Sequence, residues 1–484
     1  MRPVRALGLT LALGGLMVVV DTTVTVVAVP AIVAGLDAPL AAAQWVTTGY
    51  LLGLVAVIPL SGWASSRFGA RRVYLTALLV FTVFSACAGL AWSVASLAVF
   101  RFLQGLGGGL LNPVGQAIGL RAVPREQRGR LMSLLVLPLV IGPVFGPPLA
   151  GWLISSASWR WIFLINIPLG LVAVAVCARL LPRSVPSAET PGVDWPGLMG
   201  LSGGAILLVY GGTLLDRPGT PVSTAVLVLT AGLVLLASFV RRARRVAEPI
   251  VDLGLLSRPL LRAGLGVLAT FAAGYFGSMA VLPLYVQAVN GDPASLVGVL
   301  ALPQAVAVGL VAQVATRLVD RVPPRRIVLT GTSLGLLGGA GLAAAMMTGA
   351  GYPWIVAAWV VLSAGSGATL MPTMTIALRD LENATTPKGT SLFALSSQLS
   401  AAVGGAAVAV LLGALVTAHV PDGVAGMLAL DPAARDALRP DLALAVGGAF
   451  LLPVALLAVS ATIAVRSLRP APDPVRAGVP ATGG

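Results

Sequence analysis

Long apolar runs, each long enough to cross a lipid bilayer, follow one another along almost the whole chain and are separated by short polar loops. A membrane-spanning helix needs about 20 predominantly apolar residues. The 484-residue chain is 57% hydrophobic and 10% charged, with a mean hydropathy of +0.95. A soluble domain cannot bury that much apolar surface. The sequence therefore predicts an all-α integral membrane protein with many spans.

The apolar runs predict fourteen membrane-spanning helices. The first run follows Arg2 and Arg5, as in a signal peptide, but it is too long for one and lacks a small-residue cleavage site. We therefore expect it to remain as the first span. The predicted spans cover residues 7–31, 44–65, 73–92, 96–119, 131–154, 160–181, 195–215, 221–240, 262–287, 295–316, 326–348, 353–378, 391–416 and 442–465.

Positive charge falls on alternate loops. Arginines cluster in the loops after predicted spans two, four, six, eight and ten, and they also flank the first and last spans. Loops rich in lysine and arginine stay in the cytoplasm, so we expect both termini to be cytoplasmic. The formal net charge of +14 is therefore interpreted as a topology signal, and nucleic acid is excluded as a partner.

Two stretches of the chain repeat with nearly the same offset. The loop that ends at Arg72 resembles the loop that ends at Arg326, 254 positions later (326 − 72). Pro113 and Pro372, each the last residue of a Leu-x-Pro element, lie 259 positions apart (372 − 113). Duplicated halves are typical of transporters, whose substrate site lies between the halves near the bilayer midplane. The predicted division is a six-helix bundle in 1–182, two inserted helices and a linker in 183–257, a second six-helix bundle in 258–468 and a disordered tail in 469–484.

Asp21 and Arg101 are predicted to lie inside the membrane at one level. Asp21 is about 14 residues into the first span and Arg101 about five residues into the fourth, which places both roughly 8–9 Å below the outer face of a ~30 Å core. A charge there costs about 2.5–3.5 kcal/mol on insertion scales and usually marks an ion or proton pathway. We expect Asp21 to bind and release the transported proton, with Arg101 lying next to it. The alternative is a static ion pair that only neutralises two charges.

The fifth predicted span is rich in glycine and proline. Gly142 and Gly146 form a GxxxG face that lets another helix approach closely. Pro147 and its neighbours bend the helix and remove backbone donors.

Taken together, these motifs resemble those of the major facilitator superfamily, and specifically its fourteen-span drug:proton antiporter branch. The most specific match is Trp159–Gly170, which is similar to the branch's sixth-span signature, and Asp21 lies in a match to its first-span motif. The resemblance implies two six-helix bundles plus two extra helices, and proton-coupled export across a bacterial-type plasma membrane. The positions that match gating, proton-transfer and antiporter motifs are Gly62, Arg67, Gly69, Arg71 and Arg72, with Asp320 and Arg321 in the second copy, then Arg101, Gln104 and Gly105, and Gly142, Gly146, Pro147 and Gly151.

The chain departs from the family pattern in the loop motif. Ser66 stands where an acidic residue is usual, although the second copy retains Asp320. The resemblance implies that this acid forms a charge contact at the inner gate, which Ser66 cannot make.

The resemblance also places the substrate between the first, fourth, ninth and twelfth spans. Aromatic and methionine side chains with a few amides suit a bulky lipophilic compound. The candidate residues are Asn112, Gln116, Phe271, Tyr275, Met279 and Met371.

Three functions are compatible with the sequence. The first is proton-coupled export of hydrophobic or amphiphilic small molecules such as drugs, dyes and antibiotics. The second is dedicated export of one endogenous metabolite, such as an antibiotic or siderophore, and the third is a non-transporting membrane sensor or scaffold. The chain has no nucleophile–base set, metal-ligand cluster or phosphate-binding loop, so we expect no enzyme activity, cofactor, metal or ATP use. The expected partners are a small-molecule substrate, protons and the bilayer, with the chain as a monomer and no adaptor protein identified.

Overall fold

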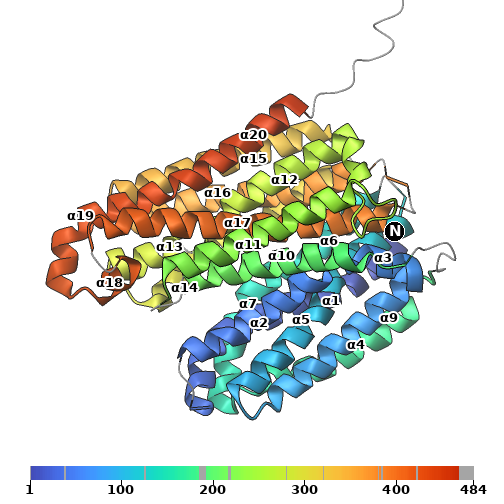
Figure 1. The fold of residues 1–484 in the computed structure, drawn as a ribbon, viewed down its shortest axis with the longest axis horizontal. Helices are drawn as coiled ribbons and strands as arrows, with labels where there is room; N and C mark the ends of the chain where they lie inside the picture. Colours follow the sequence, from blue (N-terminus) through green and yellow to red (C-terminus); the bar gives the residue numbers. More distant parts are fainter. Residues whose placement is uncertain are drawn as a thin grey trace, which may run out of the picture.

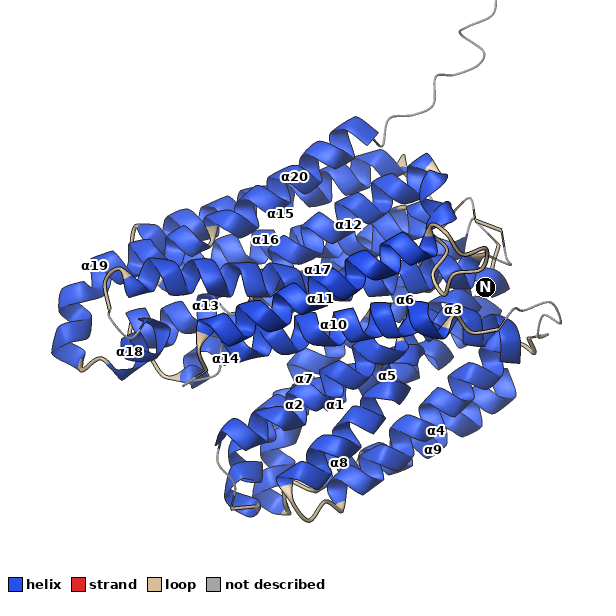
Figure 2. Ribbon diagram, viewed as in Figure 1, coloured by secondary structure: helices blue, strands red, loops and turns tan. Residues whose placement is uncertain are grey.

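The computed structural model describes residues 2–37, 40–124, 127–184, 192–215, 220–279, 281–319, 321–379, 381–382, 385–420 and 423–467. Helix makes up nearly all of this part of the chain, and it contains no strand (Figure 2). The predicted tail in 469–484 lies outside the described residues.

The first group of helices occupies the lower part of Figure 1. In it α5 packs against α2 and α4, while α1 packs against α7 and α9. The helices of this group are α1 (Arg2–Gly35), α2 (Leu40–Val57), α3 (Leu60–Ala64), α4 (Ala70–Gly89), α5 (Val94–Ala122), α6 (Arg128–Leu135), α7 (Leu137–Ser156), α8 (Trp161–Leu164) and α9 (Asn166–Leu180), with a π-helical turn at Ser65–Gly69.

The second group occupies the upper part of Figure 1. Here α12 packs against α16, α17 and α20, and α15 packs against α16 and α20. Its helices are α12 (Pro259–Gly277), α13 (Val281–Leu284), α14 (Ala294–Leu318), α15 (Pro324–Met347), α16 (Tyr352–Ala377), α17 (Thr386–Thr417), α18 (Gly423–Ala429), α19 (Pro432–Ala449) and α20 (Leu451–Ser467), with short turns at Leu253–Ser257 and Tyr285–Val289.

Helices α10 (Trp195–Leu215) and α11 (Val222–Ala243) pair with each other at the boundary between the two groups. α10 contacts α2 of the first group and α17 of the second. Ser202 Oγ donates to the carbonyl of Ala56 at 2.7 Å, and the rings of Trp45 and Tyr210 lie 5.3 Å apart. The additional helices therefore pack across the boundary between the groups.

Proline divides two of the predicted spans. In the predicted span 44–65, α2 ends at Val57 and α3 begins at Leu60, directly after Pro59. In the predicted span 131–154, α6 ends at Leu135 and α7 begins at Leu137, with Pro138 in its first turn. Proline lacks the backbone N–H that a helix interior requires but is tolerated in the first turn. These boundaries therefore differ from the predicted ones.

Within the described residues, twelve helices are long and apolar enough to span a membrane by length and composition. The predicted spans 44–65 and 131–154 have no counterpart among the twelve. The apolar helix at the first of them, Trp45–Val57, is shorter, and α7 occupies most of the second.

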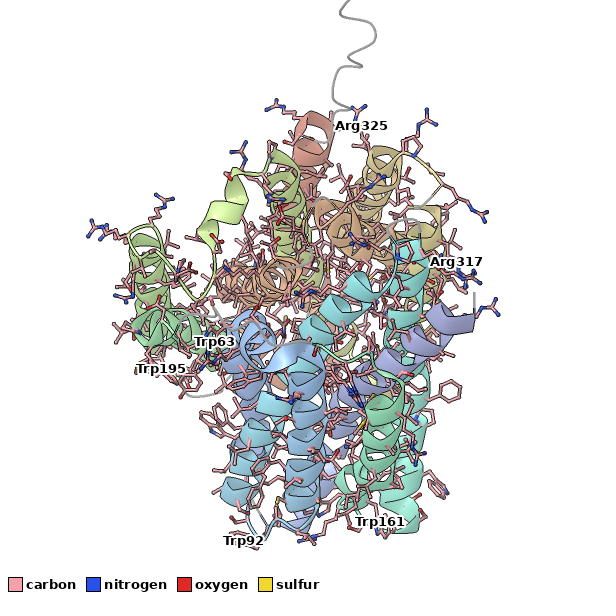
Figure 3. All side chains as sticks on the ribbon, turned by 90° about the vertical axis from the view of Figure 1, so that its right-hand side faces the viewer. Trp63, Trp92, Trp161, Trp195, Arg317 and Arg325 are labelled. Carbon is pink, nitrogen blue, oxygen red and sulfur yellow. The ribbon has the colours of Figure 1, made fainter. Side chains whose placement is uncertain are left out.

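The two groups meet at the end of the molecule where α1 begins and spread apart toward the opposite end (Figure 1). The end of α20 lies toward the same end as the start of α1. Figure 3 looks at this end: Arg317 and Arg325 project from the second group, and Trp92 and Trp161 lie at the lower edge of the first. Trp92 and Trp161 are more than half exposed, as is common for tryptophans at membrane interfaces.

Candidate functional site

Asp21 is completely buried inside the first group of helices. It is the 20th of the 34 residues of α1 and lies in a run of valines and threonines. Thr25 Oγ1 donates to the backbone carbonyl of Asp21 at 2.6 Å, which gives the Thr25 hydroxyl a partner within the helix. The Asp21 carboxylate is therefore left to side chains from other helices.

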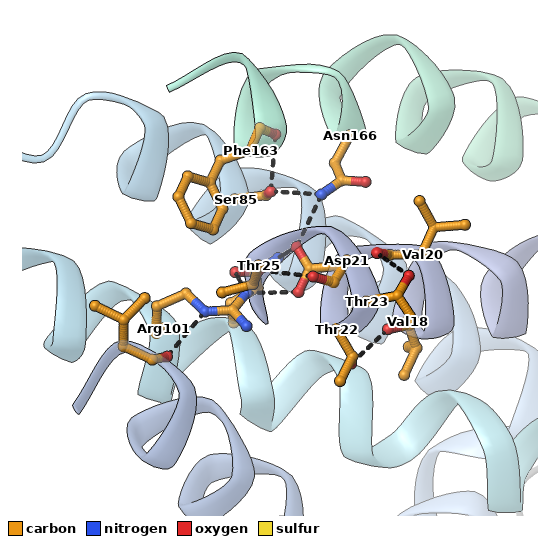
Figure 4. A network of polar contacts seen from close by, with 12 residues as sticks. Val18, Val20, Asp21, Thr22, Thr23, Thr25, Ser85, Arg101, Phe163 and Asn166 are labelled. Carbon is orange, nitrogen blue, oxygen red and sulfur yellow. Dashed lines mark hydrogen bonds and ion pairs between the residues drawn. The ribbon is translucent and has the colours of Figure 1, made fainter. Parts of the chain in front are cut away.

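Three side chains donate hydrogen bonds to the Asp21 carboxylate (Figure 4). Arg101 Nη1 lies 2.5 Å from Oδ2, and Gln104 Nε2 lies 2.9 Å from Oδ1. Asn166 Nδ2 lies 3.0 Å from the same Oδ1. Arg101 and Gln104 are three residues apart on α5 and so share one face of that helix. The structure thus brings the two predicted charges together and adds two amides.

Arg101 is as buried as Asp21, at 1% exposed. Its Nε donates to the carbonyl of Val46 at 3.2 Å, and Nη1 also donates to Gln104 Oε1 at 2.8 Å. Its Cζ lies 4.2 Å from the centre of the Tyr50 ring and 5.4 Å from that of Phe163, which is cation–π geometry. A buried charge needs this degree of pairing and hydrogen bonding to be tolerated.

Asn166 and Ser85 extend the site from α9 and α4. Asn166 Nδ2 also lies 3.0 Å from Ser85 Oγ, and Ser85 Oγ donates to the carbonyl of Phe163 at 2.9 Å. Sequence reasoning placed Asn166 inside the sixth-span signature without a role and did not single out Ser85. A polar residue within an apolar span was the signal that could have identified both.

This arrangement places one ionisable carboxylate inside the first group of helices beside one permanent cation. The carboxylate accepts from that cation and from two neutral amides, so its charge is paired and both of its oxygens are hydrogen-bonded. Among the described residues no group of three or more metal-binding side chains is found.

The predicted antiporter-motif glycines pack α7 against α1 beside Asp21. A Cβ on Gly142 would meet Val19, and one on Gly146 would meet Thr23. Thr23 Oγ1 also lies 3.3 Å from the carbonyl of Gly142. Gly151 has open space where a Cβ would be, and the Pro147 side chain lies outside the described residues.

The loop-motif glycines have separate structural roles. Gly62 contacts the start of α17, where a Cβ would lie 3.4 Å from Lys388 Cα. Gly69 has φ +85° and touches Ser184, so both its conformation and its surroundings disfavour a side chain. Arg71 Nη2 donates to the carbonyl of Ala178, within the first group.

The remaining charged residues of the loop motif make no gate contact that the structure describes. Arg67, Arg72 and Arg321 are exposed. Asp320 lies outside the described residues.

Hydrogen bonds join the two groups at the end where they meet. Ser61 Oγ and Ser391 Oγ lie 2.5 Å apart, and Ser391 Oγ is 3.0 Å from the carbonyl of Ile58. Arg128 Nη1 donates to the carbonyl of Arg379 at 3.3 Å. Neutral serines thus form a contact between the groups close to Ser66, the position that lacks the family's acid.

Five of the predicted substrate residues lie on three helices, and Met279 follows the end of α12 at Gly277. Asn112 and Gln116 are on α5, and Asn112 Oδ1 faces α1 near Gly15, where a Cβ would lie 3.5 Å from it. Met371 is half-buried on α16. A groove of about 360 Å³ between α1, α7 and α9 includes none of the predicted substrate residues.

The predicted substrate residues on α12 and directly after it differ in exposure. Phe271 and Tyr275 are buried and stack with ring centres 6.2 Å apart. Met279 is 43% exposed. Tyr275 also reaches Ser363 and Ser366 of α16, so it belongs to a neutral polar cluster in the second group.

Comparison with known proteins agrees with this architecture. Residues 11–405 match the profile of the family described as Major Facilitator Superfamily. The chain is 35% identical over 403 residues to the multidrug resistance protein B homolog of Mycobacterium tuberculosis (strain ATCC 25618 / H37Rv), covering 83% of this chain and 74% of the relative. It is 30% identical over 416 residues to the putative multidrug resistance protein MdtD of Pectobacterium carotovorum subsp. carotovorum (strain PC1), covering 85% of this chain and 88% of the relative.

Two solved structures share the fold at low sequence identity. The Escherichia coli proton:xylose symporter XylE matches with a TM-score of 0.60 and 17% identity over 96% of each chain. The human organic anion transporter MFSD10 matches with a TM-score of 0.61 and 15% identity, over 94% of this chain and 99% of that one. At these identities the likeness concerns the fold alone.

Proposed function

Because the chain belongs to the major facilitator superfamily, a family of membrane transporters and not of enzymes, we propose that it exports hydrophobic or amphiphilic small molecules in exchange for protons by alternating access. The observation that carries this proposal is the buried site at Asp21, where Arg101, Gln104 and Asn166 converge on one carboxylate. A proton moving down 100 mV releases about 2.3 kcal/mol. A single exchanging carboxylate is therefore sufficient to drive export.

Fourteen spans and cytoplasmic termini complete the proposed topology in a bacterial-type plasma membrane. α2 packs along α5 and α7 along α1, and both α5 and α1 contain spans found by length and composition. Adding α2 and α7 to the twelve candidate spans gives fourteen. An even number of spans places both ends of the chain on one side of the membrane, and α1 begins and α20 ends toward the same end of the molecule (Figure 1). The arginine-rich loops support a cytoplasmic location for that end.

With that orientation, the conformation is closed toward the cytoplasm. The contacts of Ser61 with Ser391 and of Arg128 with Arg379 hold the two groups together there, and the groups spread toward the other end. Alternating access would then require these contacts to break. The uncharged serine pair makes that step independent of the acid missing at Ser66.

The substrate class rests on the relatives and on the second group of helices. The relatives' names refer to multidrug resistance. Helices α12, α14, α15, α16 and α17 contain no acidic residue, which favours neutral or weakly charged compounds over multivalent cations. A dedicated exporter of one metabolite shares these features. A susceptibility panel separates the two, since broad resistance supports multidrug export and protection against one compound supports the alternative.

Dye accumulation in inverted membrane vesicles tests the proposal. With an imposed gradient, acidic inside, we expect ethidium and related dyes to accumulate in vesicles that carry the wild-type protein and not in those with Asp21→Asn. Asp194→Asn is the matched control. Asp194 is also buried, but it forms its 2.9 Å ion pair with Arg242, outside α1 and α5. Gradient-driven accumulation that survives Asp21→Asn contradicts the proton role.

A further inference from the structure

The side-chain oxygen of Asn166 is buried and receives no hydrogen bond within the part of the chain that the structure describes. The residue is 1% exposed, and its Nδ2 serves two acceptors, Asp21 Oδ1 and Ser85 Oγ, at 3.0 Å each (Figure 4). An unsatisfied buried acceptor costs free energy and calls for a physical explanation. A second state of the site in which this oxygen is used provides one.

Protonation of Asp21 creates such a state. In the ionised form, Asp21 accepts from Arg101, Gln104 and Asn166, and each presents an N–H to it. When a proton binds, one carboxyl oxygen becomes an O–H donor. That donor faces the same N–H groups and needs an acceptor within reach.

Two amide oxygens lie near Asp21, and only one is available. Gln104 Oε1 already accepts from Arg101 Nη1 at 2.8 Å. Asn166 Oδ1 accepts from none of the described residues. A half-turn of the Asn166 amide exchanges its oxygen and nitrogen, which places the oxygen where Nδ2 now lies, next to Asp21 Oδ1.

We infer that Asn166 is a switchable positioning residue for the proton site, which donates to the Asp21 carboxylate and, after its amide rotates, accepts from the protonated acid. This inference rests on the proposed proton coupling. It needs no new group, because the bound proton itself supplies the hydrogen bond that the rotated amide accepts.

The rotation has a consequence for Ser85. In the present state, Ser85 Oγ accepts from Asn166 and donates to the carbonyl of Phe163. Once the Asn166 oxygen faces it, the Ser85 hydroxyl turns its hydrogen toward that oxygen and releases the Phe163 carbonyl. Phe163 lies in α8, between α7 and α9, so proton binding loosens a backbone contact between α4 and this connection.

The other groups around Asp21 do not offer this function. Arg101 from α5 is a permanent donor. Tyr50 from α2 presents its ring to Arg101, and its hydroxyl, which is also buried and has no hydrogen bond among the described residues, points toward Gly108 of α5. The neighbouring positions of α7 are Gly142 and Gly146, which do not titrate. Asn166 is therefore the amide at this site that can serve both protonation states.

Infrared difference spectra of the full-length protein, recorded between pH values, test this inference without a substrate. The carboxylic-acid band that disappears in Asp21→Asn reports proton binding at Asp21. Asn166→Leu removes one of the three donors to the ionised carboxylate, which retains the other two. It also removes the free amide oxygen that would accept from the protonated acid. We therefore expect roughly tenfold lower proton affinity, with the midpoint about one pH unit lower. Gln104→Leu removes a donor and leaves the acceptor, so its midpoint should move to higher pH.

Shifts of opposite sign support the switch. Shifts of both variants to higher pH would show that Asn166 acts only as a donor and would overturn it. Asn166→Ser, whose hydroxyl both donates and accepts, should restore the wild-type midpoint, and Asn166→Ala replaces the leucine variant if that protein does not fold. A spectrum with no band sensitive to Asp21→Asn refutes the proposed proton site itself, which is a different result from bands that shift with the same sign.

Discussion

The first helices of the two groups, α1 and α12, are packed in the same way. On α1, Thr23 lies against Gly146 of α7, and a Cβ on that glycine would come within 2.2 Å of the threonine hydroxyl. On α12, Ala273 and Gly277 lie against Gly404 of α17, and a Cβ on Gly404 would come within 2.2 Å of the Ala273 carbonyl. Each group thus uses glycine on a later helix to bring it close to its first helix.

The chemistry on these two helices is different. Tyr275 follows Asp21 by 254 positions (275 − 21), the same offset that separates Arg72 from Arg326 (326 − 72). By this offset, the second group has a neutral phenol at the position that corresponds to the acid of the first. Around it are aromatic rings and serines: Phe276 lies 5.2 Å from the Tyr275 ring, and no cation faces it among its described contacts.

The comparison leads us to propose that the duplicated halves have different roles in transport. The proton exchange proposed here needs one acid and one fixed cation, and the first group encloses such a pair. The second group retains the packing without the charges, and we propose that its neutral residues contact the substrate. Four further experiments test these proposed roles.

The largest effect is expected from breaking the charge pair of the first group. Arg101→Leu leaves the Asp21 carboxylate buried without its cation, which costs about 3–5 kcal/mol for pairs of this kind. Thermal unfolding of the purified protein should show a large loss of stability, much of it recovered in the Asp21→Asn/Arg101→Leu double variant. Lys388→Leu is the control, since Lys388 and its partner Asp252 are 37% and 35% exposed and breaking an exposed pair should cost far less. Equal losses in the two single variants would contradict an enclosed pair.

The second experiment tests whether both groups depend on close helix packing at a glycine. Gly146→Leu and Gly404→Leu each place a side chain against a neighbouring helix, and overpacking typically costs about 1–3 kcal/mol. Gly151→Leu and Gly405→Leu are matched controls on the same two helices, because a Cβ at either position meets nothing within 4 Å. Unfolding temperatures should fall for the first pair and not for the second. A drop confined to Gly146→Leu would mean that only the first group depends on close packing.

A smaller effect is expected at the contact between the groups. Ser391→Ala removes its hydrogen bonds to Ser61 and Ile58, and one hydrogen bond contributes about 0.5–1.5 kcal/mol. The open fraction of this end should rise severalfold, as measured by spin-label distances between α3 and α17. Thr417→Ala removes a bond within α17 alone and should leave the distances unchanged. Unaltered distances in Ser391→Ala would show that the serine pair does not hold the gate.

The smallest effect is expected from the neutral position of the second group. Tyr275→Phe keeps the ring and removes the hydroxyl that reaches Ser363 and Ser366. Transport should retain the wild-type pH profile, while KM for individual compounds changes by a factor of a few. A displaced pH profile in Tyr275→Phe would assign part of the proton chemistry to the second group and end the division proposed here.

The sequence alone predicted the class of protein and the pair at its centre. Hydropathy and the alternation of arginine-rich loops are local properties of the chain, because the bilayer imposes one length and one charge rule on every span. The rise per residue of a helix then placed Asp21 and Arg101 at one depth, and the structure brings them to 2.5 Å. The family was likewise recognisable from motifs such as Trp159–Gly170.

The residues that surround that pair follow from the way the helices pack together. Asn166 is 145 positions from Asp21 and Gln104 is 83, and whether they meet depends on how each helix is rotated about its own axis. In a span that is apolar all round, no pattern of residues reports that rotation. For the same reason the serine contact between Ser61 and Ser391 and the open position of Gly151 could not be read from the chain. The depth of a residue in the membrane can be predicted from its position in the sequence, whereas the rotation of a helix about its axis depends on the packing of all the helices together.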